Sequence, residues 1–595
     1  MKYLFAFFTL SLSIHSLTAQ LSVRNEGFVY ANDIVVFVND DVNLEEDTAH
    51  FYLRNNAQLL QGTGTTGNSG IGKLSVYQHG TVHQSGYNYW CSPVGNTLAN
   101  DNTNRPFRAN NNIYDVTAEP ITSTLASYTT GYNGTSNPLV IASFWLYTYD
   151  PGVNYSEWDQ VLETGDVTPG YGFTMKGTSG SNNNQLYDFR GKPNNRAIFT
   201  AVRTGQGTLV GNPYPSALDA RDYIHDAINS NLIDSGTLYF WEQDLSITSH
   251  VIANYNGGYA SYTINAAGTV ETFVPATFNT YDFEGNLNTA GTPSSSGKQV
   301  YRYLPIGQGF MVTGAANGNL RVNNSMRNYV KQTEAVSEFF RNGVSARPND
   351  GYPENAITYT EDGLQILPED YKRFRLNIDF NDTYTRQLVQ TFHSSASPDK
   401  DYGLESKSSG VIDSDTYWIQ DGEPYVAQAF NFTEDLRIPL IINVENQHLI
   451  RIRIFDVQHF SPSQAIYLHD TEAGTYTNLR IQDFETTLET GSYSTRFEIT
   501  FENQALSVTD EKAVLLTLFQ NNIQEQLVIK NPTGLHIKQL SIFDVLGKQL
   551  LYKVNIPTVE KYNISTKNIS TGTYIVKLTL ASGEQISKKI IIAKR

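Results

Sequence analysis

The sequence is poor in the residues that cross-link a chain or carry it through a membrane. Its 595 residues include one cysteine, Cys91, so no intrachain disulfide can form. Beyond the N-terminal segment, no run of 18 or more apolar residues occurs, and we expect no transmembrane helix. With 42 Lys and Arg against 59 Asp and Glu, the formal net charge is −17, which disfavours nucleic acid and anionic membranes as partners.

Long stretches with a 3.6-residue apolar period are also missing, whereas residues typical of strands and turns are abundant. The chain has 37 Tyr, 30 Phe and 44 Gly. This composition predicts many short strands separated by tight turns. We therefore expect an all-β, multidomain protein built of β-sandwich-like modules, since a chain of this length exceeds one domain.

The first 19 residues have the pattern of a signal peptide. Lys2 precedes an apolar run, and small and polar residues follow up to Ala19. We expect cleavage between Ala19 and Gln20, although Leu17 is a poor match to the usual small residue three positions before the cut. The pattern predicts export through the periplasm to the cell surface or the medium.

Residues 20–86 form an N-terminal β-region in which apolar and polar residues alternate. The stretch FYLRNNAQLLQ (51–61) with its flanking turns is compatible with one coil of a short solenoid. A plain sheet explains the same alternation, so both alternatives stay open at this level.

One phrase occurs twice, as TPGYGFTMKGT (168–178) and LPIGQGFMVTG (304–314). Two further matches precede it in the same order: YNYWCSPVGN (87–96) with TLVGNPYPSAL (208–218), and SFWLYTYD (143–150) with LYFWEQD (238–244). Three ordered matches indicate a duplicated β-module, with copies at 87–200 and 205–325. The paired glycines predict positive φ or a close backbone approach before a buried Phe.

The remainder of the chain divides by composition. Residues 326–370 are polar and read as a linker, with a short helix at 331–341. Residues 371–505 carry strand patterns at a spacing that suits a β-sandwich. Residues 513–595 predict a small C-terminal β-domain, in which LASGEQ (580–585) reads as a hairpin turn. This last region has a formal charge of +7 against −24 for the rest, which suggests a separate role.

The C-terminal region resembles the type A sorting domain of the type IX secretion system of Bacteroidetes. The resemblance rests on LVIKNPTG (527–534), LSIFDVLGKQL (540–550), ISTGTYIVKL (569–578) and ISKKIII (586–592). It implies an immunoglobulin-like β-sandwich and recognition by the secretion machinery. The positions that carry the motif are Asn531, Pro532, Asp544, Gly547, Lys548, Gly572, Tyr574, Lys588 and Lys589. NYWCSPVG and VGNPYPSALD also look like stretches of flavobacterial cell-surface proteins, a likeness that implies no activity.

Few residues suggest chemistry. GTGTTG (62–67) fits a nucleotide-binding pattern but lacks the surrounding βαβ unit. Paired carboxylates in loops are weak candidates for calcium, namely Asp399, Asp401, Asp413 and Asp415. Paired acids could also serve a glycosidase. Aromatic side chains could stack on sugar rings, and the candidates are Trp145, Trp158, Trp241 and Trp418, with Tyr149 and Tyr255.

The sequence thus predicts an exported, modular surface protein without a convincing catalytic set. Adhesion, surface structure and ligand binding fit it, with extracellular glycans or other surface proteins as partners. A secreted polysaccharide-active enzyme or a carbohydrate-binding accessory protein is the alternative. We expect no cofactor apart from the calcium candidates.

Overall fold

The computed structural model describes residues 20–180, 184–290, 298–332, 357–360, 363–503, 516–522, 524–531, 534–583 and 585–594. The predicted signal peptide, most of the 331–341 helix and Pro532 lie outside these ranges. The described residues are almost entirely strands and turns, which confirms the all-β class. The two α-helices among them are single turns, α1 (Ala109–Asn112) and α2 (Ala220–Ile224). None of the described helices has the length and apolar character of a membrane span.

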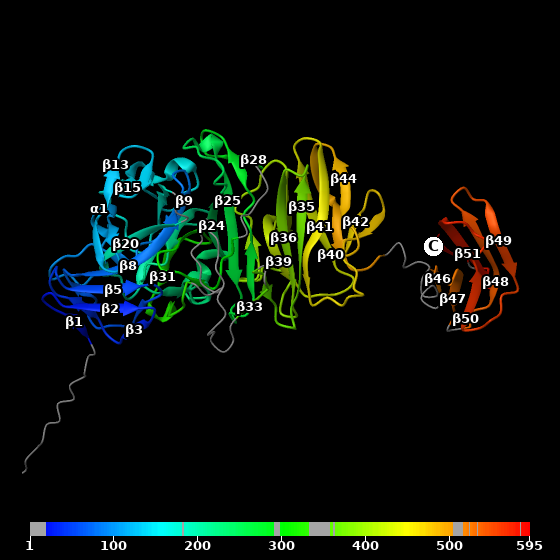
Figure 1. Cartoon of the computed structure of the whole chain (residues 1–595), viewed down its shortest axis with the longest axis horizontal. Coiled ribbons are helices and arrows are strands. Elements are labelled where there is room, and N and C mark those ends of the chain that lie inside the picture. Colours follow the sequence, from blue (N-terminus) through cyan, green and yellow to red (C-terminus); the bar gives the residue numbers. More distant parts are fainter. Residues whose placement is uncertain are drawn as a thin grey trace, which may run out of the picture. The chain divides into compact units, whose positions relative to one another are not determined.

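The N-terminal region is a short solenoid, visible in blue in Figure 1. Successive coils stack in parallel, with Leu21 beside Val42, Phe28 beside His50 and Val35 beside Gln58. Each turn of the solenoid therefore takes about 21–23 residues, and the plain-sheet alternative is wrong. Its coils are β1 (Leu21–Val23), β2 (Phe28–Asn32) and β3 (Val35–Val38); β4 (Val42–Leu44), β5 (His50–Arg54) and β6 (Gln58–Gln61); and β7 (Ser69–Gly70) and β8 (Lys73–Thr81).

Polar residues turn the corners of the solenoid while apolar residues fill it. Asn25, Asp33 and Asn55 adopt positive φ at corners, a conformation that Asn and Asp tolerate better than most residues. Strand β8 then pairs with β20 (Asn184–Pro193), so the N-terminal region and the first copy share one sheet. The apolar core continues across both of them.

The two copies of the repeat have the same strand order. In the first copy, β18 (Phe173–Lys176) lies between β9 (Tyr87–Trp90) and β16 (Tyr147–Thr148). In the second, β30 (Gly309–Gly314) lies between β22 (Gly207–Gly211) and β24 (Ile233–Gln243). In each copy, the strand of the third matched stretch is therefore central and lies between the strands of the first and second matched stretches.

The pairing register also agrees between the copies. Trp90 pairs with Phe173 in the first copy, and Val210 pairs with Phe310 in the second. Tyr147 pairs with Thr174 and, correspondingly, Tyr239 pairs with Met311. These registers make Trp90 equivalent to Val210 and Tyr147 equivalent to Tyr239.

The copies contact each other reciprocally. Trp90 bridges to Gln308 of the second copy, and Val210 bridges to the equivalent Tyr171 of the first. Cys91 N donates to Gly307 O at 2.8 Å, and the equivalent Gly211 N donates to Gly170 O at 3.2 Å. Such reciprocity is expected of two similar halves related by an approximate twofold axis.

The remaining strands of this region complete the sheets around the two copies. Their bounds are β10 (Val94–Gly95), β11 (Ile113–Ala118), β12 (Thr122–Leu125), β13 (Ser127–Thr129), β14 (Gly134–Ser136), β15 (Leu139–Ala142), β17 (Asp159–Gln160), β19 (Thr178–Ser179), β21 (Ile198–Val202), β23 (Ala217–Asp219), β25 (Asn256–Ile264), β26 (Glu271–Val274), β27 (Asn279–Tyr281), β28 (Leu287–Ala290), β29 (Tyr303–Leu304), β31 (Gly318–Val322) and β32 (Arg327–Asn328).

A β-sandwich-like domain follows, coloured from green through yellow to orange in Figure 1. Its sheet curls around one apolar core that includes Phe374, Trp418 and Phe497. Arg373 and Arg375 donate to the main-chain oxygens of Glu271 and Phe273, at 2.8 and 2.7 Å, and so tie the domain to the second copy. A separate two-stranded sheet of β33 (Thr358–Tyr359) and β34 (Gln365–Ile366) precedes the domain in the chain. The strands of the domain are β35 (Lys372–Phe380), β36 (Tyr384–Phe392), β37 (Ser406–Lys407), β38 (Asp415–Gln420), β39 (Glu423–Phe430), β40 (Arg437–Val444), β41 (His448–Gln458), β42 (Tyr467–Asp470), β43 (Thr475–Asn478), β44 (Phe484–Leu488) and β45 (Gly491–Thr500).

The chain forms two compact units, one of residues 1–472 and 477–501 and one of residues 473–476 and 502–595. In the second unit, a three-stranded and a four-stranded sheet enclose their own core, which is the predicted immunoglobulin-like sandwich. The expected hairpin at LASGEQ joins its last two strands. The strands are β46 (Thr517–Asn521), β47 (Gln526–Lys530), β48 (Ile537–Asp544), β49 (Gln549–Val554), β50 (Lys561–Ser565), β51 (Gly572–Leu580) and β52 (Gln585–Ile592).

Candidate functional site: an aromatic pocket

The first unit contains a pocket of about 1140 Å³ where the two copies meet. Strands β9, β16 and β18 of the first copy and β24, β25 and β30 of the second contribute to its wall. Its lining is unusually rich in aromatic side chains, namely Tyr87, Tyr89, Phe144, Trp145, Tyr147, Tyr149, Tyr155, Trp158, Tyr239, Trp241, Tyr255, Tyr259 and Tyr281.

Equivalent positions of the two copies face this pocket. Tyr147 and Tyr239 both line it, as do Tyr149 and Trp241 two residues further along each strand. Because side chains alternate along a strand, two lining residues that are two positions apart project from the same face of the sheet. The duplication therefore supplies two equivalent strands with aromatic side chains, β16 and β24, to one pocket.

The halves are not identical, and their difference helps to open the pocket. Tyr87 of the first copy is equivalent to Gly207 of the second, and both line the pocket. The second half also presents Gly205, Gly314 and Ala315, which leave room beside the aromatic wall of the first half. A Cβ at Gly207 would lie 3.1 Å from Cε of Met311 and 3.4 Å from Cε1 of Tyr149, so a larger side chain there would crowd two residues that line the pocket.

The aromatic rings support one another at their edges. Tyr149 and Trp158 have ring centroids 4.7 Å apart, and Trp241 and Tyr259 have centroids 5.2 Å apart. Tyr89 and Tyr259 share a hydroxyl hydrogen bond of 2.9 Å. Such packing holds the rings in fixed orientations.

Lys176 lies behind the aromatic wall. Its Nζ is 3.4 Å from the ring centroid of Trp145 and 4.7 Å from that of Tyr87. Nζ also contacts Nδ1 of His250 at 3.0 Å and donates to the hydroxyl of Tyr255. Burial lowers the pKa of this ammonium from 10.5 to about 6. The desolvated amine thus links the loop that carries His250 to the first copy.

The charged groups at the pocket rim neutralise one another. Lys400 Nζ lies 2.7 Å from Asp234 Oδ1, and Lys407 Nζ lies 3.5 Å from Asp234 Oδ2 and 3.1 Å from Glu423 Oε2. Among the described residues, Asp234 is the one carboxylate that lines the pocket, and it is committed to these lysines. The described lining thus lacks the two carboxyl groups that glycoside hydrolysis usually requires.

The structure brings together most of the aromatic residues singled out from sequence. Trp145, Trp158 and Trp241 line the pocket, with Tyr149 and Tyr255. Trp418, in contrast, is fully buried in the sandwich core, where its indole N–H donates to Val389 O at 3.1 Å, so it cannot serve as a binding platform.

Other residues of the pocket were missed at the sequence level. Tyr87 and Tyr89, Tyr239, Tyr259 and Tyr281 carry its wall, and Lys176 stands behind it. The available signal was the alternation of aromatic residues within the repeated stretches, YNYW and LYTY. Alternation shows that such residues share a face, but not which face the fold covers.

Two of the four carboxylates considered for calcium are committed to protein donors. Asp415 forms a two-pronged pair with Arg386, at 2.8 and 2.6 Å, and Asp401 accepts from Ser397 N at 2.7 Å. Asp399 and Asp413 are exposed. Within the described ranges, no group of three or more His, Cys, Asp or Glu side chains is placed to hold a metal ion.

The GTGTTG loop holds a carboxylate of the protein itself. The main-chain N–H groups of Thr65, Thr66 and Gly67 all donate to Asp41 Oδ2, at 2.7–3.0 Å. These hydrogen bonds lower the pKa of Asp41 against the opposing effect of burial. The loop amides that could cradle a phosphate are therefore already occupied by Asp41.

Cys91 is unavailable as a reactive thiol, because it is buried and desolvation raises the pKa of its thiol.

Several of the positions on which the resemblance to a sorting domain rests form turns in the second unit. The side-chain amide of Asn531 donates to Leu535 O and accepts from Leu535 N, at 2.8 Å each. Asp544 accepts from the N–H groups of the following turn, where Gly547 has a φ of +83°. Tyr574 donates to Ser570 O at 2.9 Å. Lys548 lies in the same turn, Gly572 begins β51, and Lys588 and Lys589 are exposed on β52.

A family model described as Domain of unknown function (DUF8693) matches residues 8–501, and another, described as Domain of unknown function (DUF8694), matches residues 507–592. A comparison with curated proteins gave no match. Similar solved structures include a DUF3244 family protein with an immunoglobulin-like beta-sandwich fold from Bacteroides vulgatus ATCC 8482. The two sequences are 20% identical, the match covers 13% of this chain and 84% of that chain, and the TM-score is 0.12. Another is the BSP domain of a biofilm associated protein, at 11% identity, 76% and 87% coverage and a TM-score of 0.12. TM-scores this low support no argument, so the fold class rests on the sheets themselves.

Proposed function

The chain belongs to the family described as Domain of unknown function (DUF8693), and within it we propose that this member is an exported, non-enzymatic β-protein that binds carbohydrate in its aromatic pocket. The observation that carries the proposal is the convergence of 13 aromatic side chains on one pocket of about 1140 Å³. Ligand sites are typically concave and lined by apolar and aromatic groups with a few polar ones.

Carbohydrate suits this wall better than other small ligands. A sugar ring presents C–H groups on its faces and hydroxyls around its edge. The rings of Trp158 and Trp241 offer flat apolar surfaces to the faces, while tyrosine hydroxyls can bond the edges. The neutralised rim favours an uncharged ligand, and the pocket volume exceeds the usual range for small ligands, which favours an oligosaccharide.

We propose binding rather than catalysis because of the charged groups at the pocket rim. A glycosidase of the usual kind needs one acid and one base or nucleophile on either side of the scissile bond. In the described lining, Asp234 alone carries a carboxyl group, and two lysines hold it. The pocket can therefore hold and orient a sugar, but its own side chains provide no pair of groups to cleave one.

Export forms the second part of the proposal. The predicted signal peptide and the resemblance of residues 513–595 to a type IX sorting domain support passage through the periplasm to the cell surface or the medium. The protein would then meet glycans outside the cell, as an adhesive or glycan-binding component of the surface.

A glycan array followed by titration tests the proposal. The purified chain from Gln20 should bind at least one oligosaccharide on the array, with a change in tryptophan fluorescence on titration. Trp158→Ala and Trp241→Ala should each weaken that binding by about tenfold or more, which equals about 1.4 kcal/mol. Gly207→Leu should block the pocket without removing any aromatic ring.

Tyr552→Ala provides the matched control, because Tyr552 is an exposed aromatic residue of the second unit. It should bind as the parent protein does. An array without any hit, or equal affinity of the parent and the pocket variants, would remove the pocket from the functional account.

A further inference from the structure

The first coil of the solenoid is an open end of the stack. Its strands β1, β2 and β3 pair with β4, β5 and β6 of the second coil, and among the described residues no strand pairs with their other sides. Figure 1 labels these three strands at the end of the first unit that lies away from the sandwich domain. Unpaired strand edges present main-chain N–H and C=O groups to whatever lies beside them.

The hydrogen bonds identify the main-chain groups that face the open side of β2. His50 N donates to Gly27 O, and Asp33 N donates to Arg54 O, both at 3.2 Å. Because successive residues of a strand direct their main-chain groups to opposite sides, the odd-numbered residues of β2 bond β5. Tyr30, in the middle of β2, therefore directs its N–H and C=O groups to the open side.

The apolar core of the solenoid is also open at this end. Three side chains of the first coil pack against that core but are only partly buried, namely Leu21, Val29 and Val36. Their register partners one coil further on are 0–1% exposed, namely Val42, Phe51 and Leu59. The first coil thus covers the second, but it has no equivalent cover among the described residues. Solenoid ends normally carry a capping element with a polar outer face.

The same coil exposes large apolar side chains and lacks the usual protection of a strand edge. Five such side chains within ten residues are at least 41% exposed, namely Phe28, Tyr30, Ile34, Val35 and Phe37. Residues 20–38 contain neither proline nor lysine, two residues that keep exposed edges from pairing. A concentration of exposed apolar groups of this kind is typical of an interaction surface.

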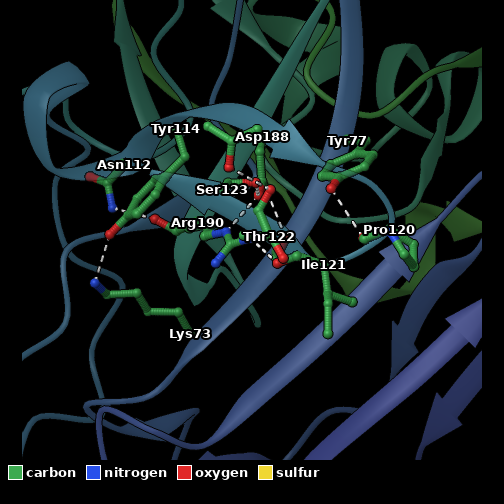
Figure 2. A network of polar contacts seen from close by, with 12 residues as sticks. Lys73, Tyr77, Asn112, Tyr114, Pro120, Ile121, Thr122, Ser123, Asp188 and Arg190 are labelled. Atoms are coloured by element: carbon green, nitrogen blue, oxygen red, sulfur yellow. Dashed lines mark hydrogen bonds and ion pairs between the residues drawn. The ribbon is translucent and has the colours of Figure 1, made fainter. Parts of the chain in front are cut away.

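Further along the same sheet, the chain covers its own strands. The segment that leads into β12 lies against β20, where Ile121 O accepts from Arg190 Nη2 at 2.7 Å and Ser123 Oγ donates to Asp188 at 2.7 Å (Figure 2). Asp188 is fully buried there. The chain's own side chains thus close this part of the sheet, whereas β2, at the opposite end of the strand order, is left without a cover among the described residues.

The charges of the first coil balance. Residues 20–38 contain one cation, Arg24, and two carboxylates, Glu26 and Asp33, and Asp33 pairs with Lys331 at 2.8 Å. These four groups, two positive and two negative, sum to zero on a chain with a formal charge of −17. Since like charges repel across a contact, this end suits a second molecule of the same acidic chain.

We propose that the first coil binds the first coil of a second molecule of this chain, so that two solenoids stack end to end about a twofold axis. A lone strand of another protein would pair one of the three open strands and leave the other two. A second solenoid end presents three open strands at once. In a twofold contact the facing strands run antiparallel, with β2 against β2 and β1 against β3 of the other molecule.

The dimer goes beyond the proposed function, because it does not depend on what the pocket binds. It covers the partly buried side chains at the open end and pairs the free main-chain groups of three strands. With a glycan in each pocket, the dimer would also gain avidity for a ligand of repeated units.

Sedimentation velocity of the chain from Gln20 over a range of concentrations tests the proposal, and we expect a reversible dimer. Tyr30→Lys places a lysine on each of the two facing β2 strands. Tyr30→Pro removes an N–H from the open side without removing a hydrogen bond to β5. Each variant should raise the dissociation constant of the dimer about tenfold or more. Phe455→Lys is the matched control, because Phe455 is 49% exposed on β41 of the same unit.

A cross-link tests the arrangement without weakening it. Tyr30→Cys adds an exposed thiol to a chain whose own cysteine, Cys91, is buried. A short bis-maleimide should join two molecules of this variant, since the two β2 strands face each other at their middles. The same reagent should leave Phe455→Cys uncoupled.

A monomer at every concentration would overturn the proposal. So would a dimer that both Tyr30→Lys and Tyr30→Pro leave unchanged, or one that Tyr30→Cys fails to cross-link. A monomer whose β2 amides resist hydrogen exchange would also overturn it, because another segment of the chain would then occupy the open side. An empty glycan array leaves these results unaffected.

Discussion

At the residue scale, burial strongly lowers the pKa of Lys176, which lies behind the aromatic wall of the pocket. Its ammonium is removed from water, and the contacts to Trp145, Tyr255 and His250 replace only part of the lost hydration. No ion pair of Lys176 occurs among the described residues. Its amine is consequently poised to lose its proton near neutral pH, unlike the lysines of the rim, whose pKa values are raised by hydrogen bonds and ion pairs to Asp234 and Glu423 against the effect of burial.

Lys176→Met should change how stability depends on pH. In the folded parent protein, the pKa of Lys176 is about 6, whereas an unfolded lysine titrates near 10.4. Between these values the unfolded chain binds one proton more, so this group makes stability rise with pH, and its full penalty is present below about pH 6. The variant lacks this dependence.

Urea unfolding of the first unit at pH 7, 8 and 9 measures the effect. The free energy of unfolding of the parent should gain about 1.4 kcal/mol per pH unit relative to Lys176→Met. Lys73→Met is the matched control, because it makes the same change at a half-buried lysine of the same unit. Equal slopes for the parent and Lys176→Met would show that the amine stays protonated in its aromatic cage.

At the element scale, the repeated Gly-x-Gly-Phe phrase joins the two copies. The first glycine of each phrase, Gly170 or Gly307, has positive φ, at +89° and +79°. The second glycine, Gly172 or Gly309, lies where the main chain of one copy comes close to the first strand of the other. A Cβ at Gly309 would lie 2.8 Å from the carbonyl carbon of Tyr89, and one at Gly172 would lie 2.7 Å from Cγ of Leu209. Each copy thus depends on a glycine to accept the first strand of the other.

Gly309→Ala should destabilise the first unit by about 2–4 kcal/mol, because its new methyl group meets main-chain atoms that cannot rotate away. Gly172→Ala should cost somewhat less. Its methyl group would also meet main-chain oxygens, of Trp90 at 2.9 Å and Val210 at 3.1 Å, but its nearest neighbour is a leucine side chain that can shift. Gly131→Ala is a suitable control, with ordinary φ and one side-chain atom at 3.4 Å. Denaturant unfolding compares the three, and an unchanged midpoint for Gly309→Ala would contradict this account of the phrase.

At the scale of the whole molecule, the chain forms two compact units. The first holds the solenoid, both copies, the sandwich and the pocket, and the second has its own core of residues such as Leu540, Val576 and Leu578. A unit with a separate core can be removed without opening the other. This separation allows binding and export to be tested independently.

Deletion of residues 513–595 should leave the protein in the periplasm of the native cells while its pocket still binds glycan. The expected block follows from the resemblance of this segment to a sorting domain, and retained binding follows from the independent core of the first unit. Fractionation and immunoblotting locate the protein, and tryptophan fluorescence measures binding by the purified truncated form. Normal secretion of the truncated protein would rule out the proposed export route.

Sequence patterns predicted the strand-rich class and the duplication because both are local properties. Alternating residues, turn formers and three ordered matches are visible without any long-range contact. The convergence of Trp145 and Trp241 was not visible, since it depends on how one copy docks on the other. The burial of Trp418 was equally hidden, because its strand has no local mark that distinguishes a covered face from an open one.

The sequence by itself thus determined what each segment can form: strands, tight turns, a signal-peptide pattern and two related modules. Only the tertiary structure decided that strands of the first 86 residues wind into a solenoid, that the copies exchange contacts reciprocally and that their unlike halves enclose a pocket. The physical reason is the range of the interactions. Backbone propensity and side-chain alternation act over a few residues, whereas a pocket exists only where surfaces distant in the sequence meet without filling the space between them.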